Sequence, residues 1–501
     1  MLTARLNRAG WGRAIRVLAP LGALVVEGWP ALIGAVLIQE AGLWLAGRLV
    51  APPALAPSVP ANIPPKGSPL GSTPSGRERG VAQQLFLAAY GLRVAITVPT
   101  HYVAKLGDGN GALFSDDYTN DLVGEWLVRI ARGDGISIFR GHQHLLDGLY
   151  PYVLMGVHAI FGFTPLLPKL LNGGLAALCA VLIFGMAREM FRTPAAVIAG
   201  LGAAVLPTLV IWSVATLKES LVLLLALLGL RIVQFLATAP RPHGRLADAL
   251  VSLLAILVLL LDLRSTTAAI LFGLALVVLV ARTTYRPRPW QLGLSVVALL
   301  ILLGSGVWFT RVRTSSRPIG GVVEDVVLQI RHRRAQEAAG ANSQVRPDGD
   351  APIATSTDIP TMEAASDAAP FTMTEDVLKP LGYALLSPAP WQARSVTELG
   401  ASAEMPIWYM LIVASCLAVQ ATLVDPRQRL FAVCLVVYGI ANWLILAASE
   451  GNVGNLLRHR LMLDPVLLIF GGAGLEWLWV RAGRPFSTRL PGLLIPARSD
   501  G

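Results

Sequence analysis

The chain has 501 residues, of which 54% are hydrophobic and only 14% are charged, and its mean hydropathy is +0.60. Soluble globular proteins average about 25% charged residues, so this composition excludes a water-soluble fold for most of the chain. The formal net charge of +10 does not indicate a nucleic-acid partner, because the arginines lie in short loops between apolar runs and form no basic face. The three cysteines each lie inside an apolar run, which is typical of small core residues and favours neither a metal site nor disulfides: Cys179, Cys416 and Cys434.

The N-terminal part has no clear membrane arrangement. Residues 1–50 combine a basic start with a long apolar stretch that is too long for a signal peptide. The basic residues favour the cytoplasmic side, so residues 17–50 are expected to form a hairpin or to lie in the membrane plane, although they are short for two spans. Residues 51–80 contain eight prolines and are expected to form an extended linker.

Beyond the linker, ten apolar runs have lengths that suit membrane-spanning helices. These runs lie at 82–103, 165–187, 194–212, 220–237, 247–262, 266–281, 292–310, 405–423, 430–448 and 461–480. Almost all charges fall near the ends of these runs, and the exception is Arg93. We therefore interpret all ten as transmembrane helices.

The segment from Asp147 to Gly162 is apolar but has only 16 residues, and counting it as a span would move every later loop to the other side of the membrane. With this segment in the membrane interface, most arginine-rich short loops share one side. Positive charge in short loops favours the cytoplasmic side. We therefore expect residues 147–162 to form an interfacial helix and not a span.

This topology divides the chain into successive parts with two long segments outside the cytoplasm. A transmembrane module at 81–310 contains the first outer loop at 104–164. A large outer loop at 311–404, whose composition predicts partial disorder, precedes C-terminal transmembrane helices and a cytoplasmic tail at 405–501. The predicted fold is thus an all-α polytopic membrane protein with about 10–12 transmembrane helices and one interfacial helix.

The first outer loop carries adjacent carboxylates, Asp116 and Asp117, followed by Asp121. Carboxylates near a membrane surface are costly to place, so a functional role is a reasonable hypothesis. A carboxylate beside an acceptor hydroxyl or amine can act as a general base while a bond to a sugar forms. The alternative is that Asp116 and Asp117 cap the helix that follows them.

Other polar residues lie near the outer ends of the predicted spans. Arg458 and Arg460 are candidate phosphate ligands, since arginine donates paired hydrogen bonds to phosphate, and the alternative is that they mark the membrane interface. His142 and His144 lack a third ligand, so a divalent metal is weakly supported and no metal site is assigned. The remaining candidates for the site are Lys218, Glu219, Asp262, Arg264, Asn452 and His459.

The order of several motifs resembles a known family. After the acidic pair at 116–117 the chain contains Tyr150-Pro151-Tyr152, Lys169-Leu170-Leu171-Asn172-Gly173-Gly174, Trp212-Ser213 and Leu217-Lys218-Glu219-Ser220. This order, over roughly 82–310, resembles the GT-C membrane glycosyltransferases, specifically their protein O-mannosyltransferase and aminoarabinose-transferase-like bacterial group. The later segments 382–391 and 450–460 are similar to uncharacterised bacterial members of that group.

The resemblance implies a GT-C-like bundle in a bacterial cytoplasmic (inner) membrane, with an active site that faces outward. It implies transfer of a sugar from a polyprenyl-phosphate donor to a glycan, lipid or protein acceptor, with catalytic roles for Asp116, Asp117 and Glu219. Family members often have a tyrosine three residues after the acidic pair, whereas here Tyr118 follows directly and Asn120 falls at that spacing. Which aspartate is the base therefore stays open. One base and a phosphate leaving group suffice for a single displacement with inversion, without an assigned cofactor.

Three alternatives remain at this point. An O-antigen polymerase- or ligase-like protein would use Arg and His of the late loops, at 331–334 or 458–460. A transporter would favour charges within spans, internal repeats and broken helices, and no repeat is found. An inactive scaffold is the third alternative.

Overall fold

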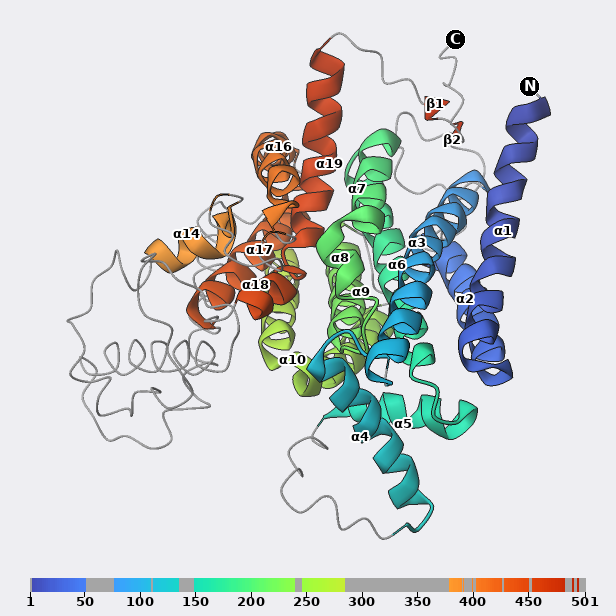
Figure 1. Ribbon diagram of the computed structural model, residues 1–501. Coiled ribbons are helices and arrows are strands. Elements are labelled where there is room, and N and C mark those ends of the chain that lie inside the picture. The colour runs from blue at the N-terminus through green and yellow to red at the C-terminus, as the bar shows by residue number, and fades with distance from the viewer. Residues whose placement is uncertain are drawn as a thin grey trace, which may run out of the picture.

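The computed structural model describes residues 2–50, 76–109, 111–134, 148–238, 246–283, 378–389, 391, 399, 402–425, 428–449, 453–482, 489–490 and 493–494. This part of the protein is helical apart from two-residue strands, β1 (Arg489–Leu490) and β2 (Leu493–Leu494), which pair antiparallel. Most long helices run roughly side by side in one bundle, with α4 (Ser115–Ala131) and α5 (Leu149–Phe161) at one end (Figure 1). We call this end of the molecule the α4–α5 end.

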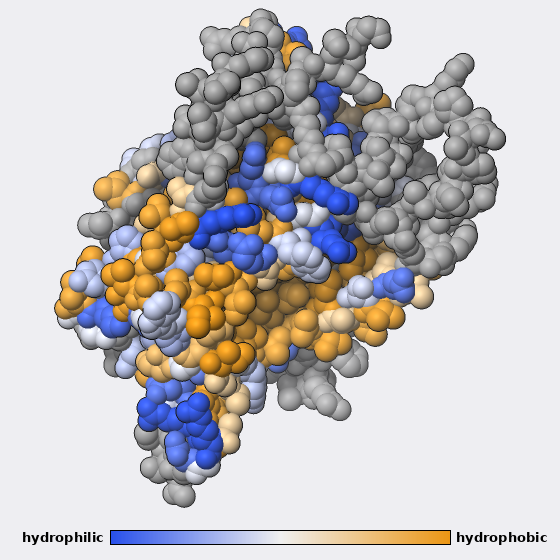
Figure 2. All heavy atoms as spheres, turned by 90° about the vertical axis from the view of Figure 1, so that its right-hand side faces the viewer, coloured by the Kyte–Doolittle hydropathy of each residue, from blue (hydrophilic) through white to orange (hydrophobic). Residues whose placement is uncertain are grey.

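Seven of the described helices are long and apolar enough to cross a membrane. They are α2 (Trp29–Leu49), α3 (Gly76–Asp108), α6 (Leu166–Met190), α9 (Glu219–Thr238), α10 (Leu246–Thr283), α16 (Met405–Val424) and α17 (Arg429–Ser449). Figure 2 shows a broad hydrophobic surface across the middle of one face of the molecule. The predicted all-α polytopic fold is confirmed, and the protein is a multi-pass membrane protein.

Three of the predicted spans differ from the observed helices or fall outside them. The run at 194–212 is divided into α7 (Thr193–Val205) and α8 (Pro207–Ile211), because Leu206 before the proline adopts a non-helical ψ of 122°. The last run begins later than predicted, as α19 (Asp464–Arg481), after the short helix α18 (Val453–Arg460). The run at 292–310 lies outside the described residues.

Two predicted spans, 247–262 and 266–281, form the two halves of α10. Arg264 breaks this helix, since its φ of −160° and ψ of 85° are not helical. The charge of Arg264 acts on Glu219 at the start of α9, whereas Leu271 lies against Gly229 in the middle of α9. The second half of α10 therefore runs back along α9 from the break, as expected of two spans joined by a tight turn.

The N-terminal part forms a helical hairpin, one of the two arrangements that the sequence left open. Helix α1 (Leu2–Glu27) packs against α2, and Gly28 between them has a φ of +79°, a conformation that glycine adopts readily. The N-terminal part is long enough for two helices because α1 begins at Leu2 and so includes the basic N-terminal residues. The hairpin packs closely on the bundle: a Cβ at Gly42 would lie 2.0 Å from the Phe86 ring.

The core of the bundle is built around α6, which is buried along most of its length. Helix α19 packs on α16 and α7 through small residues, and a Cβ at Gly474 would lie 2.0 Å from the Ala414 carbonyl oxygen. Such close contacts between helices are typical of membrane bundles. Helix α5 has 13 residues, about 20 Å of helix, which is too short to cross a hydrocarbon core.

Candidate functional site

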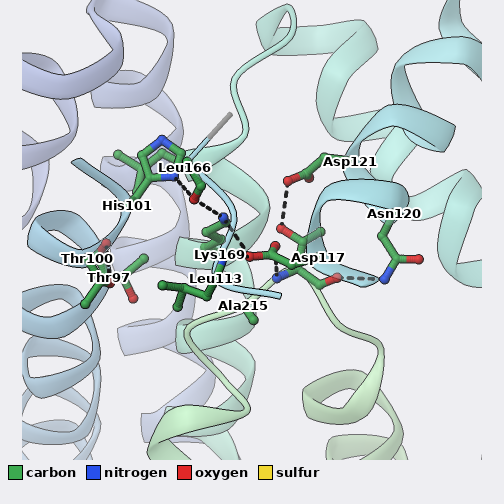
Figure 3. A network of polar contacts seen from close by, with 12 residues as sticks. Thr97, Thr100, His101, Leu113, Asp117, Asn120, Asp121, Leu166, Lys169 and Ala215 are labelled. Carbon is green, nitrogen blue, oxygen red and sulfur yellow. Dashed lines mark hydrogen bonds and ion pairs between the residues drawn. The ribbon is translucent and has the colours of Figure 1, made fainter. Parts of the chain in front are cut away.

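Asp117 is fully buried at the start of α4 and accepts three hydrogen bonds (Figure 3). Its Oδ2 accepts from the Leu113 backbone N–H at 2.8 Å and from Lys169 Nζ at 2.9 Å. Its Oδ1 accepts from the Thr216 backbone N–H at 2.7 Å. Both oxygens are thus occupied, and Asp117 joins α4 to α6 and to the segment between α8 and α9.

The capping interpretation of the acidic pair does not describe this arrangement. The N-cap residue of α4 is Phe114, which makes no side-chain capping bond. The two backbone donors of Asp117, Leu113 and Thr216, both lie outside α4. Asp117 therefore binds backbone N–H groups of two segments that lie next to the start of α4.

Asp116 lies in a different environment from its neighbour and contacts Arg458 of α18. Arg458 Nη1 lies 3.0 Å from Asp116 Oδ2, and Arg458 Nε lies 2.6 Å from Glu219 Oε1 at the start of α9. The Asp116 side chain is 63% exposed, whereas that of Glu219 is 3% exposed. The structure thus brings together three predicted site residues from distant parts of the chain, and we call them the Asp116–Arg458–Glu219 cluster.

Further charges surround this cluster. Burial alone would lower the pKa of Arg458, but the carboxylates of Glu219 and Asp116 outweigh it and raise that pKa. Desolvation lowers the pKa of Lys218, and the cations Arg458 and Arg264 add to this effect while Glu219 opposes it. The cluster is therefore a region of dense, mixed charge in which Arg458 stays cationic.

Two other predicted site residues also lie at the α4–α5 end. Asp262, beside the break in α10, accepts a hydrogen bond from the Leu149 backbone N–H at the start of α5. Arg264 interacts electrostatically with Glu219 and Lys218. The tight turn predicted around these residues thus faces the cluster.

Asp121 lies one helical turn beyond Asp117 and is buried beside His158 of α5. Thr216 Oγ1 donates to Asp121 Oδ2 at 3.1 Å, while Asp121 Oδ1 lies 3.8 Å from His158 Nε2. Within the described structure, Asp121 Oδ1 and both His158 ring nitrogens lack a hydrogen-bond partner. Burial, reinforced by the Asp117 carboxylate, raises the pKa of Asp121 well above its usual range, and burial lowers the pKa of His158.

A chain of polar contacts that the sequence did not single out supports Asp117 from the other side. His101 Nδ1 donates to the Gly111 carbonyl oxygen at 2.8 Å, and His101 Nε2 lies 2.9 Å from Glu27 Oε1. Lys169 Nζ donates to the same Gly111 oxygen at 2.7 Å. The contacts therefore run from the N-terminal hairpin to Asp117. Lys169 lies near the start of the predicted span at 165–187, where an ionisable residue is costly unless it is paired, and this is the signal that could have identified it.

Arg460 lies apart from the cluster although it is only two residues from Arg458. Its guanidinium group is buried and donates to the carbonyl oxygens of Ala384, Tyr383 and Ser387, at the end of α14 (Lys379–Leu386). These bonds satisfy carbonyl groups that the end of a helix leaves without partners. The guanidinium group of Arg460 thus donates its hydrogen bonds to backbone carbonyl oxygens of the segment at the end of α14.

The other candidates are only partly described. His459 acts electrostatically on Glu219. His142, His144 and Asn452 lie outside the described residues. Among the residues that the structure describes, no group of three His, Cys, Asp or Glu side chains could hold a metal ion.

The fold and this site define a multi-pass α-helical membrane protein with a polar cluster at one end of its bundle. No family model, curated protein or solved structure matches the chain.

Proposed function

We propose that this protein is a membrane glycosyltransferase that transfers a sugar from a polyprenyl-phosphate donor to an acceptor outside the cytoplasm. The observation that carries the proposal is the Asp116–Arg458–Glu219 cluster. It combines an exposed carboxylate, which can accept a proton, with a guanidinium group that suits a phosphate. The GT-C resemblance predicts an acidic residue of this kind in the first outer loop.

The distribution of arginines supports an outward orientation of the cluster. Glu27, at the turn of the N-terminal hairpin, accepts a hydrogen bond from Leu166 at the start of α6, so this turn lies near the α4–α5 end. The opposite ends of α2, α6 and α19 carry Arg48, Arg188 and Arg481. Since arginines in short loops favour the cytoplasmic side, the α4–α5 end faces outward.

In the proposed reaction, the acceptor oxygen attacks the anomeric carbon of the sugar while Asp116 takes the acceptor proton. The bond between the anomeric carbon and the phosphate oxygen breaks, and the polyprenyl phosphate leaves with the electron pair. Arg458 stabilises the negative charge that develops on this phosphate. A single displacement inverts the anomeric configuration, so a retained configuration in the product would contradict this mechanism.

The other acidic residues position these two groups. Glu219 is buried against Arg458 and orients its guanidinium group. Asp117 holds the start of α4, which carries Asp116, through its bonds to Leu113, Lys169 and Thr216. Fixed geometry of this kind lowers the entropic cost of bringing the reacting groups together.

Release of label from a panel of radiolabelled polyprenyl-phosphate sugars tests the proposal. The sugars are incubated with membranes that contain the full-length protein. Wild-type protein should release label from at least one donor, and Asp116→Asn should slow release by a factor on the order of 100, as expected for loss of a general base. Asp134→Asn is the matched control, because Asp134 is an exposed carboxylate beyond the end of α4. Equal rates for Asp116→Asn and wild type, or no release from any donor, would contradict the proposal.

The polymerase- or ligase-like alternative shares Arg458 with this mechanism. Of the two late arginines, Arg460 already donates to backbone carbonyl groups, so Arg458 is the better placed for a donor phosphate. A pyrophosphate-linked glycan in the same panel separates the two functions. Release from this donor alone would favour the alternative.

A further inference from the structure

We propose that Asp116 and the phosphate of the donor compete for Arg458, so that binding of the donor releases Asp116 to act as the base. This inference deepens the proposed function and rests on it for the role of Asp116 in transfer. The competition itself is a property of binding, and it can be measured without any transfer reaction.

The two carboxylates hold Arg458 with unequal strength. The Asp116–Arg458 pair is the weaker of the two, because the Asp116 side chain is 63% exposed and water solvates its carboxylate when it separates from Arg458, whose own side chain is 15% exposed. The Glu219 side chain is buried, and removing Arg458 would take away the cation in contact with its carboxylate. An incoming phosphate therefore displaces Asp116 and leaves Glu219 in place.

Glu219 also has the capacity to keep Arg458 bound during this exchange. Glu219 Oε2 is buried and has no hydrogen-bond partner within the described structure. Arg458 Nε, although 2.6 Å from Glu219 Oε1, likewise has no hydrogen-bond partner there. When the guanidinium group turns away from Asp116, it can donate to both Glu219 oxygens in the paired geometry that arginine forms with carboxylates. The remaining N–H groups then face the phosphate.

Asp116 stays at the site after it separates from Arg458. Its neighbour Asp117 is fixed by three hydrogen bonds, so the first turn of α4 does not need to move. The oxygen that contacted Arg458 becomes available for the proton of the acceptor. The base is thus released when the leaving group is in place, and the predicted order is donor first and acceptor second.

Binding of a polyprenyl monophosphate without sugar, measured on the full-length protein in detergent, tests the competition. Asp116→Ala should bind this lipid about fivefold more tightly, the factor expected for loss of a competing ion pair whose carboxylate is largely exposed. Arg458→Gln should bind it more weakly by a factor on the order of 10 to 100, since it lacks the charged donor. Inorganic phosphate and a polyprenyl alcohol show whether the headgroup alone or the whole lipid is required.

A double variant separates competition from general repulsion between Asp116 and an anion. If the effect of Asp116 acts through Arg458, Asp116→Ala should not tighten binding in the Arg458→Gln background. Equal tightening in both backgrounds, or no tightening in the single variant, would overturn the inference. Tighter binding by Asp116→Ala without transfer from any donor would support the competition and contradict the proposed transferase.

Discussion

Asp116 and Asp117 are adjacent in the chain, yet one is largely exposed beside Arg458 and the other is fully buried beside Lys169. This separation follows from their positions in the first turn of α4, where consecutive side chains point in different directions. For the proposed transferase, this difference favours Asp116 as the base and Asp117 as a positioning residue. The sequence had left this choice open.

Breaking the Asp117–Lys169 pair should strongly destabilise the fold, because each charge is buried and needs the other. Asp117→Asn or Lys169→Met alone should lower the free energy of unfolding by about 3–5 kcal/mol, since each leaves one buried charge without its partner. The double variant should recover part of this loss. Thermal unfolding in detergent measures these effects, and a double variant that loses the full sum of the single effects would argue against the pairing.

Arg93 should be needed for the break between α7 and α8. Its guanidinium group donates to the carbonyl oxygens of Ala204 at 3.0 Å and Ala203 at 3.4 Å, and its Nε donates to Ser213 Oγ at 2.9 Å. Arg93→Met should reduce stability by about 2–4 kcal/mol, because it leaves buried carbonyl groups without donors. Arg129→Met, which removes an exposed i,i+4 pair with Glu125, should change stability by less than about 0.5 kcal/mol. Similar unfolding temperatures for the two variants would contradict this role.

His101 should connect the N-terminal hairpin to the loop that precedes α4. Its two ring nitrogens face the Gly111 carbonyl oxygen and the Glu27 carboxylate. His101→Phe and Glu27→Ala should therefore increase hydrogen exchange of the backbone amides at 111–118. Lys105→Ala is the control, because Lys105 is half exposed and lies 3.8 Å from Glu27. If Lys105→Ala increases exchange as much as the other variants do, the contact through His101 is not the connection.

Asp121 should make stability depend on pH. Burial and the Asp117 carboxylate raise its pKa well above the usual range, so folding favours the protonated acid. For an acid whose pKa is higher in the folded state, the contribution to stability is fully present below the unfolded pKa, about 4, and is lost as pH rises through the folded pKa. Asp121→Asn should therefore lose less stability than wild type as pH rises above about 4. Parallel unfolding temperatures across pH 4–8 would rule out this contribution.

The membrane fold could be predicted because apolar runs and sparse charges leave few other structures for this chain. The arrangement of the N-terminal part could not, since the hairpin depends on close contacts with distant helices. A Cβ at Gly34 would lie 2.5 Å from Leu167, and nothing in the local sequence identifies that partner. The sequence prediction did not divide the run at 194–212 at Leu206, because hydropathy does not reflect the restriction that Pro207 places on the backbone of the residue before it.

The candidate site was predictable residue by residue but not as a unit. Glu219 and Arg458 stand out because each is charged and lies near the end of an apolar run, and Asp116 stands out because it belongs to an adjacent acidic pair in the first outer loop. These residues come together only through the packing of α4, α9 and α18. Asp116 and Arg458, for example, are 342 positions apart in the sequence. Arg460 has the same sequence signal as Arg458, and only the structure distinguishes its backbone contacts.

The meeting of Asp116 and Arg458 on the outer side of the membrane is the central claim, and sided crosslinking tests it most directly. In a variant whose native cysteines are replaced, Asp116→Cys and Arg458→Cys are introduced together, and a short membrane-impermeant bifunctional thiol-reactive crosslinker is added to right-side-out vesicles. We predict a crosslink between positions 116 and 458 without permeabilisation, and none when Arg460→Cys replaces Arg458→Cys, because Arg460 is buried beside α14. A crosslink that forms only after permeabilisation, or no crosslink between 116 and 458, would contradict the account.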